Sequence, residues 1–122
     1  GETRIEVCDL FSARGAFIHV KRHTRSATLS HLLSQGSVSA RLFHLYPEYR
    51  GWFRGKLPGR TKSLIKTDSV DSRKFSVVYA FTARPGFDCP GNLSFFSKVN
   101  LLFHERQIRM GYAVALYHIH EV

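Results

Sequence analysis

A carboxylate, an imidazole and an ammonium group are spaced along the first part of the chain in a way that could act on a phosphodiester. Asp9 stands at the end of a strand-like segment, and the next such segment carries His19 and Lys21. Alternation along a strand places His19 and Lys21 on the same face. With Arg22 and His23 beside them, these groups would suit a metal-independent ribonuclease, in which histidine moves the proton and the cations stabilise the phosphorane.

An Asp followed by x-Val-Lys on a paired strand resembles the core of the restriction-endonuclease-like nucleases, whose usual pattern is Asp and then Glu-x-Lys. The resemblance implies a catalytic role for Asp9, His19 and Lys21. It also implies that the Asp9 carboxylate and the Val20 carbonyl hold Mg²⁺ or Mn²⁺, which activates a water that the Lys21 ammonium positions. His19 departs from the pattern, because it stands where Glu is expected and imidazole is a poor Mg²⁺ ligand. Glu6 could supply a carboxylate, but a regular strand places it on the face opposite Asp9.

The same residues also fit a hairpin that ends in an aspartate and carries a lysine on its exposed face. The other histidines have no strong motif spacing, although His118 and His120 share one strand face and could form half of a metal site. The sequence has no glycine-rich phosphate loop, no nucleophile elbow and no Cys-x-x-Cys motif. Catalysis is therefore one hypothesis beside simple binding.

Positive charge predicts a polyanionic partner. The chain has 18 Lys and Arg residues against 9 Asp and Glu residues, a formal net charge of +9. Residues 41–74 alone hold 9 basic and 3 acidic residues. Such an excess attracts DNA or RNA, although it can also serve only to keep a surface soluble.

Three glycines and Pro58 interrupt the stretch 51–66, which favours a loop or a short frayed helix over a regular element, and we interpret it as an exposed basic loop. Trp52 lies between Arg50 and Arg54, and an aromatic ring can stack on a base while guanidinium groups hold phosphates. The residues expected to contact nucleic acid are Arg22, Arg25, Arg50, Trp52, Arg54, Lys56, Arg60, Lys62 and Lys66.

A rival hypothesis needs no nucleic acid. The basic surface could belong to a non-catalytic interaction module that docks on an acidic protein, or on the upstream part of its own parent chain.

Length and composition limit the other possibilities. A chain of 122 residues that is 43% hydrophobic is expected to form a single domain over residues 1–122. Two cysteines are too few for a disulfide-stapled secreted scaffold, and we expect no signal peptide and no membrane span. These features predict a cytoplasmic protein. Because the chain opens directly into a strand-like segment, we expect it to be a piece of a longer protein.

The elements that would position Asp9, His19 and Lys21 begin with a hairpin. Apolar and polar residues alternate over Arg4–Leu10 and Ala16–Arg22, and the tight connection between them predicts an antiparallel pair. Leucines at helical spacing then predict a helix over Ser26–Gln35 that stops at Gly36. A second helix is expected from Ser37 to the residue before Pro47.

The second half of the chain predicts a strand, a helix and a strand. Residues Phe75–Thr82 are β-branched and aromatic, as is typical of a central strand covered on both faces. A helix is expected over Lys98–Met110 and a last strand over Tyr112–Ile119. This last strand should run parallel to the strand Phe75–Thr82, with a right-handed crossover between them. The expected fold class is α/β or α+β, with a mixed β-sheet that starts with the hairpin and is flanked by helices.

A wider resemblance rests on IEVCDLFSARGAFIHVKR, SATLSHLLSQGSVSARLF, SFFSKVNL and GYAVALYHI. With these segments the chain resembles the carboxy-terminal part of a family of sporadically distributed, functionally uncharacterised bacterial proteins. The resemblance implies a large intracellular parent protein, in a mobile-element or defence context. It implies no activity.

Overall fold

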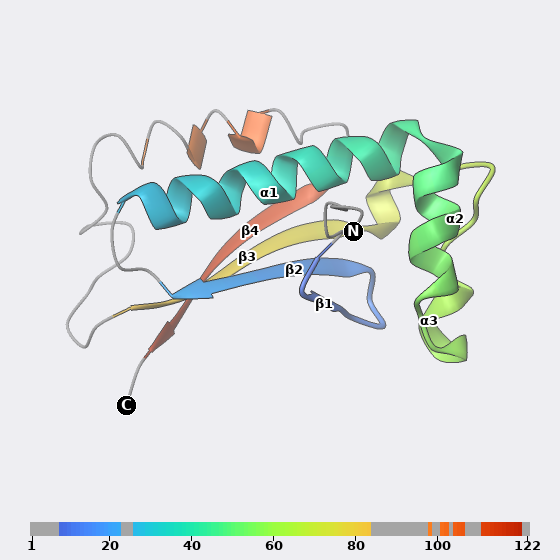
Figure 1. The fold of residues 1–122 in the computed structure, drawn as a ribbon, viewed down its shortest axis with the longest axis horizontal. Coiled ribbons are helices and arrows are strands. Elements are labelled where there is room, and N and C mark those ends of the chain that lie inside the picture. The colour runs from blue at the N-terminus through green and yellow to red at the C-terminus, as the bar shows by residue number, and fades with distance from the viewer. Residues whose placement is uncertain are drawn as a thin grey trace, which may run out of the picture.

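A four-stranded mixed sheet forms the centre of the structure, a computed structural model that describes residues 8–22, 26–83, 98, 101, 102, 104–106 and 111–120. The strands are β1 (Leu10–Phe11), β2 (Ala16–Arg22), β3 (Ser76–Ala83) and β4 (Ala113–His120). They lie in the order β1-β2-β3-β4, with β1 antiparallel to β2 and the other two pairs parallel. Figure 1 shows helices beside this sheet, and the expected α+β class with a mixed sheet is confirmed.

The hairpin between β1 and β2 is closed by a serine and a glycine. The Ser12 hydroxyl accepts a hydrogen bond from the Ala16 N–H at 3.1 Å, and the Gly15 N–H donates to the Ser12 carbonyl at 3.0 Å. Gly15 has φ of 82°, and a Cβ there would overlap the Lys74 carbonyl, so only glycine fits this turn. The predicted antiparallel pairing is confirmed, although the described part of the first strand is Leu10–Phe11 and residues 1–7 lie outside the described residues.

One continuous helix, α1 (Ser26–Leu45), covers one face of the sheet. The prediction of two helices that break at Gly36 is wrong. A Cβ at Gly36 would overlap the Tyr79 ring, and the Tyr79 hydroxyl donates to the Leu33 carbonyl at 3.1 Å. Gly36 is therefore a point of close approach between α1 and β3, not the end of a helix.

The basic stretch is helical over residues 51–55 and 59–62, so the prediction of a loop is wrong for these residues. It folds as α2 (Pro47–Gly55) and α3 (Gly59–Lys62), and a short 3-10 helix, η1 (Ser72–Lys74), precedes β3. Pro47 suits the first turn of α2, where its missing N–H needs no partner. Tyr49, Trp52 and Phe53 recur at helical spacing and pack on the core, which stabilises α2.

The second half of the chain follows the prediction where it is described. β3 is central, β4 runs parallel to it, and Phe81 pairs with His118 in the register. Residues 98, 101, 102 and 104–106 are helical. His104 hydrogen bonds to two serines of α1, which places this connection beside α1 (Figure 1).

The core lies between α1 and the sheet. Phe17, Phe43 and Phe53 form a cluster of aromatic contacts, with ring centroids 4.8 to 6.2 Å apart. Both described connections between parallel strands lie on this one side of the sheet. The opposite face carries Tyr117 and Ile119 of the edge strand β4, which are 63% and 44% exposed, and Ala80 of the central strand β3, which is 6% exposed.

Candidate nucleic-acid interface

Asp9 joins the start of β1 to β2. Its backbone N–H donates to the Ile18 carbonyl at 3.0 Å, and its Oδ2 accepts from the Val20 N–H at 2.7 Å. The carboxylate thus takes the acceptor position that the next residue of an antiparallel ladder would occupy. Since the N–H and C=O of one residue leave a strand on the same side, the Val20 carbonyl faces the same edge.

His19 is a core residue. Its side chain is 3% exposed and its ring lies 5.7 Å from the Tyr79 ring, on the face that α1 covers. Burial lowers the pKa of His19, and the nearby Asp9 carboxylate opposes that shift in part. Lys21 shares the face, as the alternation predicts, but it is exposed at the end of β2. The structure therefore brings Asp9 beside β2 while it encloses the imidazole.

The described residues around Asp9 offer few ligands for a metal ion. Within the part of the chain that the structure describes, no three His, Cys, Asp or Glu side chains gather in a group that could hold a metal ion. Asp9 offers one carboxylate oxygen, and a neutral buried imidazole does not suit Mg²⁺. Glu6, His23 and the His120 side chain lie outside the described residues. Mg²⁺ or Mn²⁺ binding at Asp9 and the Val20 carbonyl stays a prediction.

Arg50 does not belong to the exposed basic surface. It is 4% exposed, and its Nη1 donates to the Phe43 carbonyl at 2.8 Å and to the His44 carbonyl at 3.1 Å. Its Nε and Nη2 donate to the Thr67 carbonyl at 3.2 and 2.9 Å. This guanidinium satisfies carbonyls at the end of α1 and ties the helix to the segment after α3.

The other cations of this region do reach solvent. Arg54, Lys56, Arg60 and Lys66 are exposed, and Lys62 is half-buried. Arg54 donates through Nε to the Ile65 carbonyl at 3.1 Å, which fixes its position. None of these five cations forms an ion pair with a carboxylate of the described residues. Arg22 is exposed at the end of β2, and Arg25 lies outside the described residues.

A groove of about 290 Å³ lies between the start of β1 and α2. Its lining consists of Cys8, Asp9, Phe11, Trp52, Phe53, Lys56 and Leu57. Lys56 Nζ lies 4.5 Å from the centroid of the Trp52 ring, a cation–π contact worth about 0.5–1 kcal/mol at an exposed site. Behind Trp52 the pKa of Tyr49 is raised to about 12, mainly by burial and also by Cys8.

The sequence gives no signal that could have found this groove. Asp9 and Trp52 are far apart along the chain, and α2 meets the hairpin through Phe11 and Phe53, whose rings are 5.2 Å apart. Trp52 was expected to contact nucleic acid, but Asp9 was assigned to a separate catalytic site. The structure places both in one lining.

No described helix is long and apolar enough to cross a lipid bilayer. The sequence matches a family described as a family of unknown function (DUF6119) over residues 1–120. Neither a search of curated proteins nor a search of solved structures finds a match. The expected membership of a functionally uncharacterised family is confirmed, and the match assigns no nuclease activity.

Proposed function

The chain belongs to this family of unknown function, and we propose that it binds nucleic acid through the exposed cations of α2, α3 and the segment that follows them. One observation carries the proposal. Arg54, Lys56, Arg60, Lys62 and Lys66 form a cluster without ion pairs to described carboxylates, and no acidic residue lies between Glu48 and Asp68. Cations that gather without carboxylate partners raise the local positive potential and attract phosphates.

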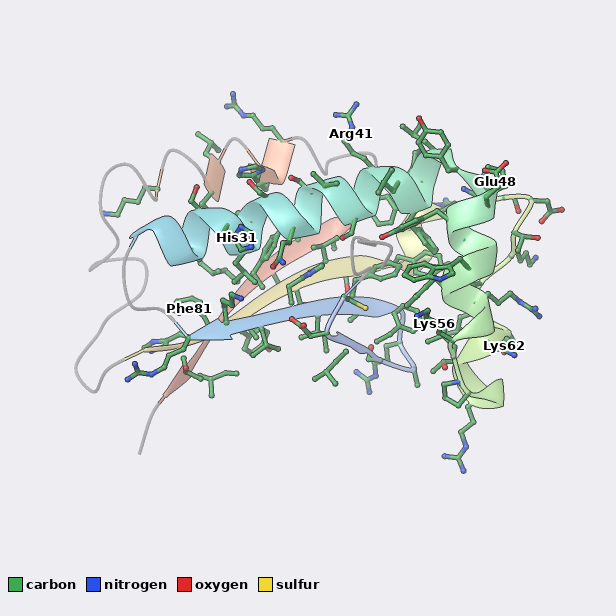
Figure 2. The ribbon with its side chains drawn as sticks, in the orientation of Figure 1. His31, Arg41, Glu48, Lys56, Lys62 and Phe81 are labelled. Carbon is green, nitrogen blue, oxygen red and sulfur yellow. The ribbon has the colours of Figure 1, made fainter. Side chains whose placement is uncertain are left out.

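The fold supports the proposal because it presents these cations on a fixed scaffold. Phe53 and Ile65 are buried in the core, and Thr61 is buried within α3. Figure 2 shows Lys56 and Lys62 near the end of α2 that is remote from α1. Charges held on a packed helical unit contact phosphates with a smaller loss of entropy than charges on a loose loop.

The test is the salt dependence of oligonucleotide binding. We expect fluorescence anisotropy with labelled DNA and RNA to show affinity that falls steeply between about 50 and 200 mM NaCl, because binding releases counterions. The double variant Arg60→Glu/Lys66→Glu should weaken binding by about tenfold or more. The matched control Lys98→Glu/Arg106→Glu removes the same charges from exposed positions outside the cluster, and it should bind more tightly than the first variant. Salt-independent binding, or equal losses in both variants, contradicts the proposal.

The rival hypothesis of an acidic protein partner gives a different result in the same assay. A surface built for a carboxylate-rich protein should bind polyglutamate at least as tightly as an oligonucleotide of equal charge. Tighter binding of the oligonucleotide favours nucleic acid, because its bases can stack on an aromatic side chain such as Trp52 and polyglutamate has no such rings.

The same samples test catalysis. Incubation with Mg²⁺, Mn²⁺ or EDTA shows whether the bound strands are cut. Metal-dependent cleavage that Lys21→Ala abolishes would assign nuclease activity to the end of β2. Cleavage of RNA alone in EDTA would favour the histidine-based ribonuclease hypothesis.

A further inference from the structure

We infer that the groove between the start of β1 and α2 accepts one base of a single-stranded nucleic acid. The inference deepens the proposed function and rests on it. The groove combines aromatic rings, one cation and one carboxylate, and its volume of about 290 Å³ is sufficient for a nucleobase and part of its sugar. Stacking on aromatic side chains beside a cationic track is how many proteins bind single strands.

Trp52 supplies the stacking surface. It is half-buried, it lines the groove, and its ring lies 5.7 Å from that of Tyr49. The other aromatic residues of the lining, Phe11 and Phe53, also pack against the core cluster and close the apolar side. An indole held from behind in this way offers a base a platform whose orientation is already fixed.

Lys56 connects this platform to the cationic cluster. Its Nζ lies over the Trp52 ring at 4.5 Å, and its side chain is exposed. A contact of this kind is weak enough for a phosphate to draw the ammonium away. The sugar-phosphate chain then leaves the groove at Lys56, which is itself a member of the cationic cluster.

Asp9 gives the groove a base preference. One carboxylate oxygen accepts from the Val20 N–H, and the other has no hydrogen-bond partner among the described residues. A fixed carboxylate repels phosphate but accepts hydrogen bonds from the imino and amino groups of a base. Guanine presents two such donors side by side, whereas the single imino group of uracil is flanked by two carbonyls. We therefore expect guanine to bind better than uracil.

The geometry also excludes duplexes from the groove. A base within a helix is stacked and paired, so it cannot reach Trp52 without being extruded. Duplexes can still contact the outer cations through phosphates. Binding to the cluster and binding in the groove are thus separable.

Trp52 provides the test, because it is the single tryptophan of the chain. We expect the pentanucleotide UUGUU to quench tryptophan fluorescence more strongly than a short duplex does. UUGUU should also bind several-fold more tightly than UUUUU. Asp9→Asn should remove the preference for UUGUU, because the amide still accepts from the Val20 N–H but turns an NH₂ group to the base. Lys98→Ala, a charge loss outside the groove, should leave the quenching and the preference unchanged.

Anisotropy with labelled UUGUU separates stacking from misfolding. Trp52→Leu should weaken binding about tenfold, whereas Trp52→Phe, which keeps a ring, should retain most of it. Equal affinities of the Leu and Phe variants would overturn the inference. Salt-dependent binding without quenching would also overturn it while the proposed function stands. The absence of any salt-dependent binding would remove both.

Discussion

The His19 imidazole is enclosed between α1 and the sheet, beside the Tyr79 ring, and its Nε2 has no hydrogen-bond partner among the described residues. Burial lowers the pKa of His19 below the 6.5 of an ordinary histidine. The folded state therefore binds its proton less readily than the unfolded state does. A histidine of this kind opposes folding in acid.

We expect the free energy of unfolding to fall as the pH drops from about 7 to about 5, because the unfolded chain takes up protons that folded His19 resists. His104, whose pKa burial also lowers, adds to the slope. His19→Phe should reduce this pH dependence and leave stability at pH 7 equal or slightly higher, since it removes a buried polar atom. Urea unfolding at several pH values measures how the free energy of unfolding depends on pH. The exposed His31→Gln is the control, and an unchanged slope in His19→Phe would contradict the account of His19.

Arg50 is expected to be a stability residue. Its guanidinium bridges the Phe43, His44 and Thr67 carbonyls inside the protein. Arg50→Ala should therefore lower the free energy of unfolding by about 2–4 kcal/mol, and Arg50→Lys should rescue little, because an ammonium cannot span these acceptors. Thermal unfolding checks this, with Arg60→Ala, which removes an exposed arginine, as the control. Equal stability of both alanine variants would show that the internal bonds contribute nothing.

The sequence predicts side-chain positions correctly where they depend on the alternation along one strand. It does not predict which charged side chains the fold buries. Alternation along Ala16–Arg22 correctly placed His19 and Lys21 on one face, and the hairpin correctly brought Asp9 beside β2. Charge alone could not separate Arg50 from Arg54, although one is buried and the other exposed. Arg50 is buried because it can bond to the carbonyls at the end of α1, and the position of α2 next to that end of α1 is a tertiary feature.

The two predicted elements that proved wrong share a cause, since both rest on glycine as a breaker. Gly36 lies inside α1, where the neighbouring Tyr79 ring requires a small residue. In the stretch 51–66, glycine and proline weighed more than the helical spacing of Trp52 and Phe53. Tertiary packing outweighs local propensity at both places.

Gly36→Ala should destabilise the protein even though alanine is the better helix former. A Cβ at Gly36 overlaps the Tyr79 ring, so α1 must move away from β3 or Tyr79 must leave its rotamer, at a cost of about 1–3 kcal/mol. Gly51→Ala in α2 is the matched control, because its Cβ would lie 3.6 Å from Thr67 Cγ2, an ordinary contact. The control should gain up to about 1 kcal/mol. Chemical denaturation of the two variants gives opposite signs if the close approach at Gly36 is real.

The sheet order explains the open face of the whole molecule. Right-handed crossovers that advance through a sheet in one direction place their connections on the same side. β2, β3 and β4 follow one another in this way, and both described connections lie on the side of α1. Leu10, Tyr117 and Ile119 of the other face are exposed. An apolar sheet face of this kind favours association, whereas the net charge of +9 opposes it.

Because of this apolar attraction and charge repulsion, self-association of the protein should depend on salt in the opposite direction to nucleic-acid binding. Raising NaCl screens the repulsion between chains of charge +9 but leaves apolar attraction in place, so self-association at a fixed protein concentration should increase with salt. Tyr117→Thr/Ile119→Thr should reduce that association, because it removes two of the exposed apolar side chains of the sheet face. Leu45→Thr/Tyr46→Thr is the matched control, since it removes one tyrosine and one aliphatic side chain of similar exposure between α1 and α2. Sedimentation velocity measures the association of each form. A wild-type protein that associates less at high salt, or a control that loses as much association as the sheet variant, would show that this face is not what brings the chains together.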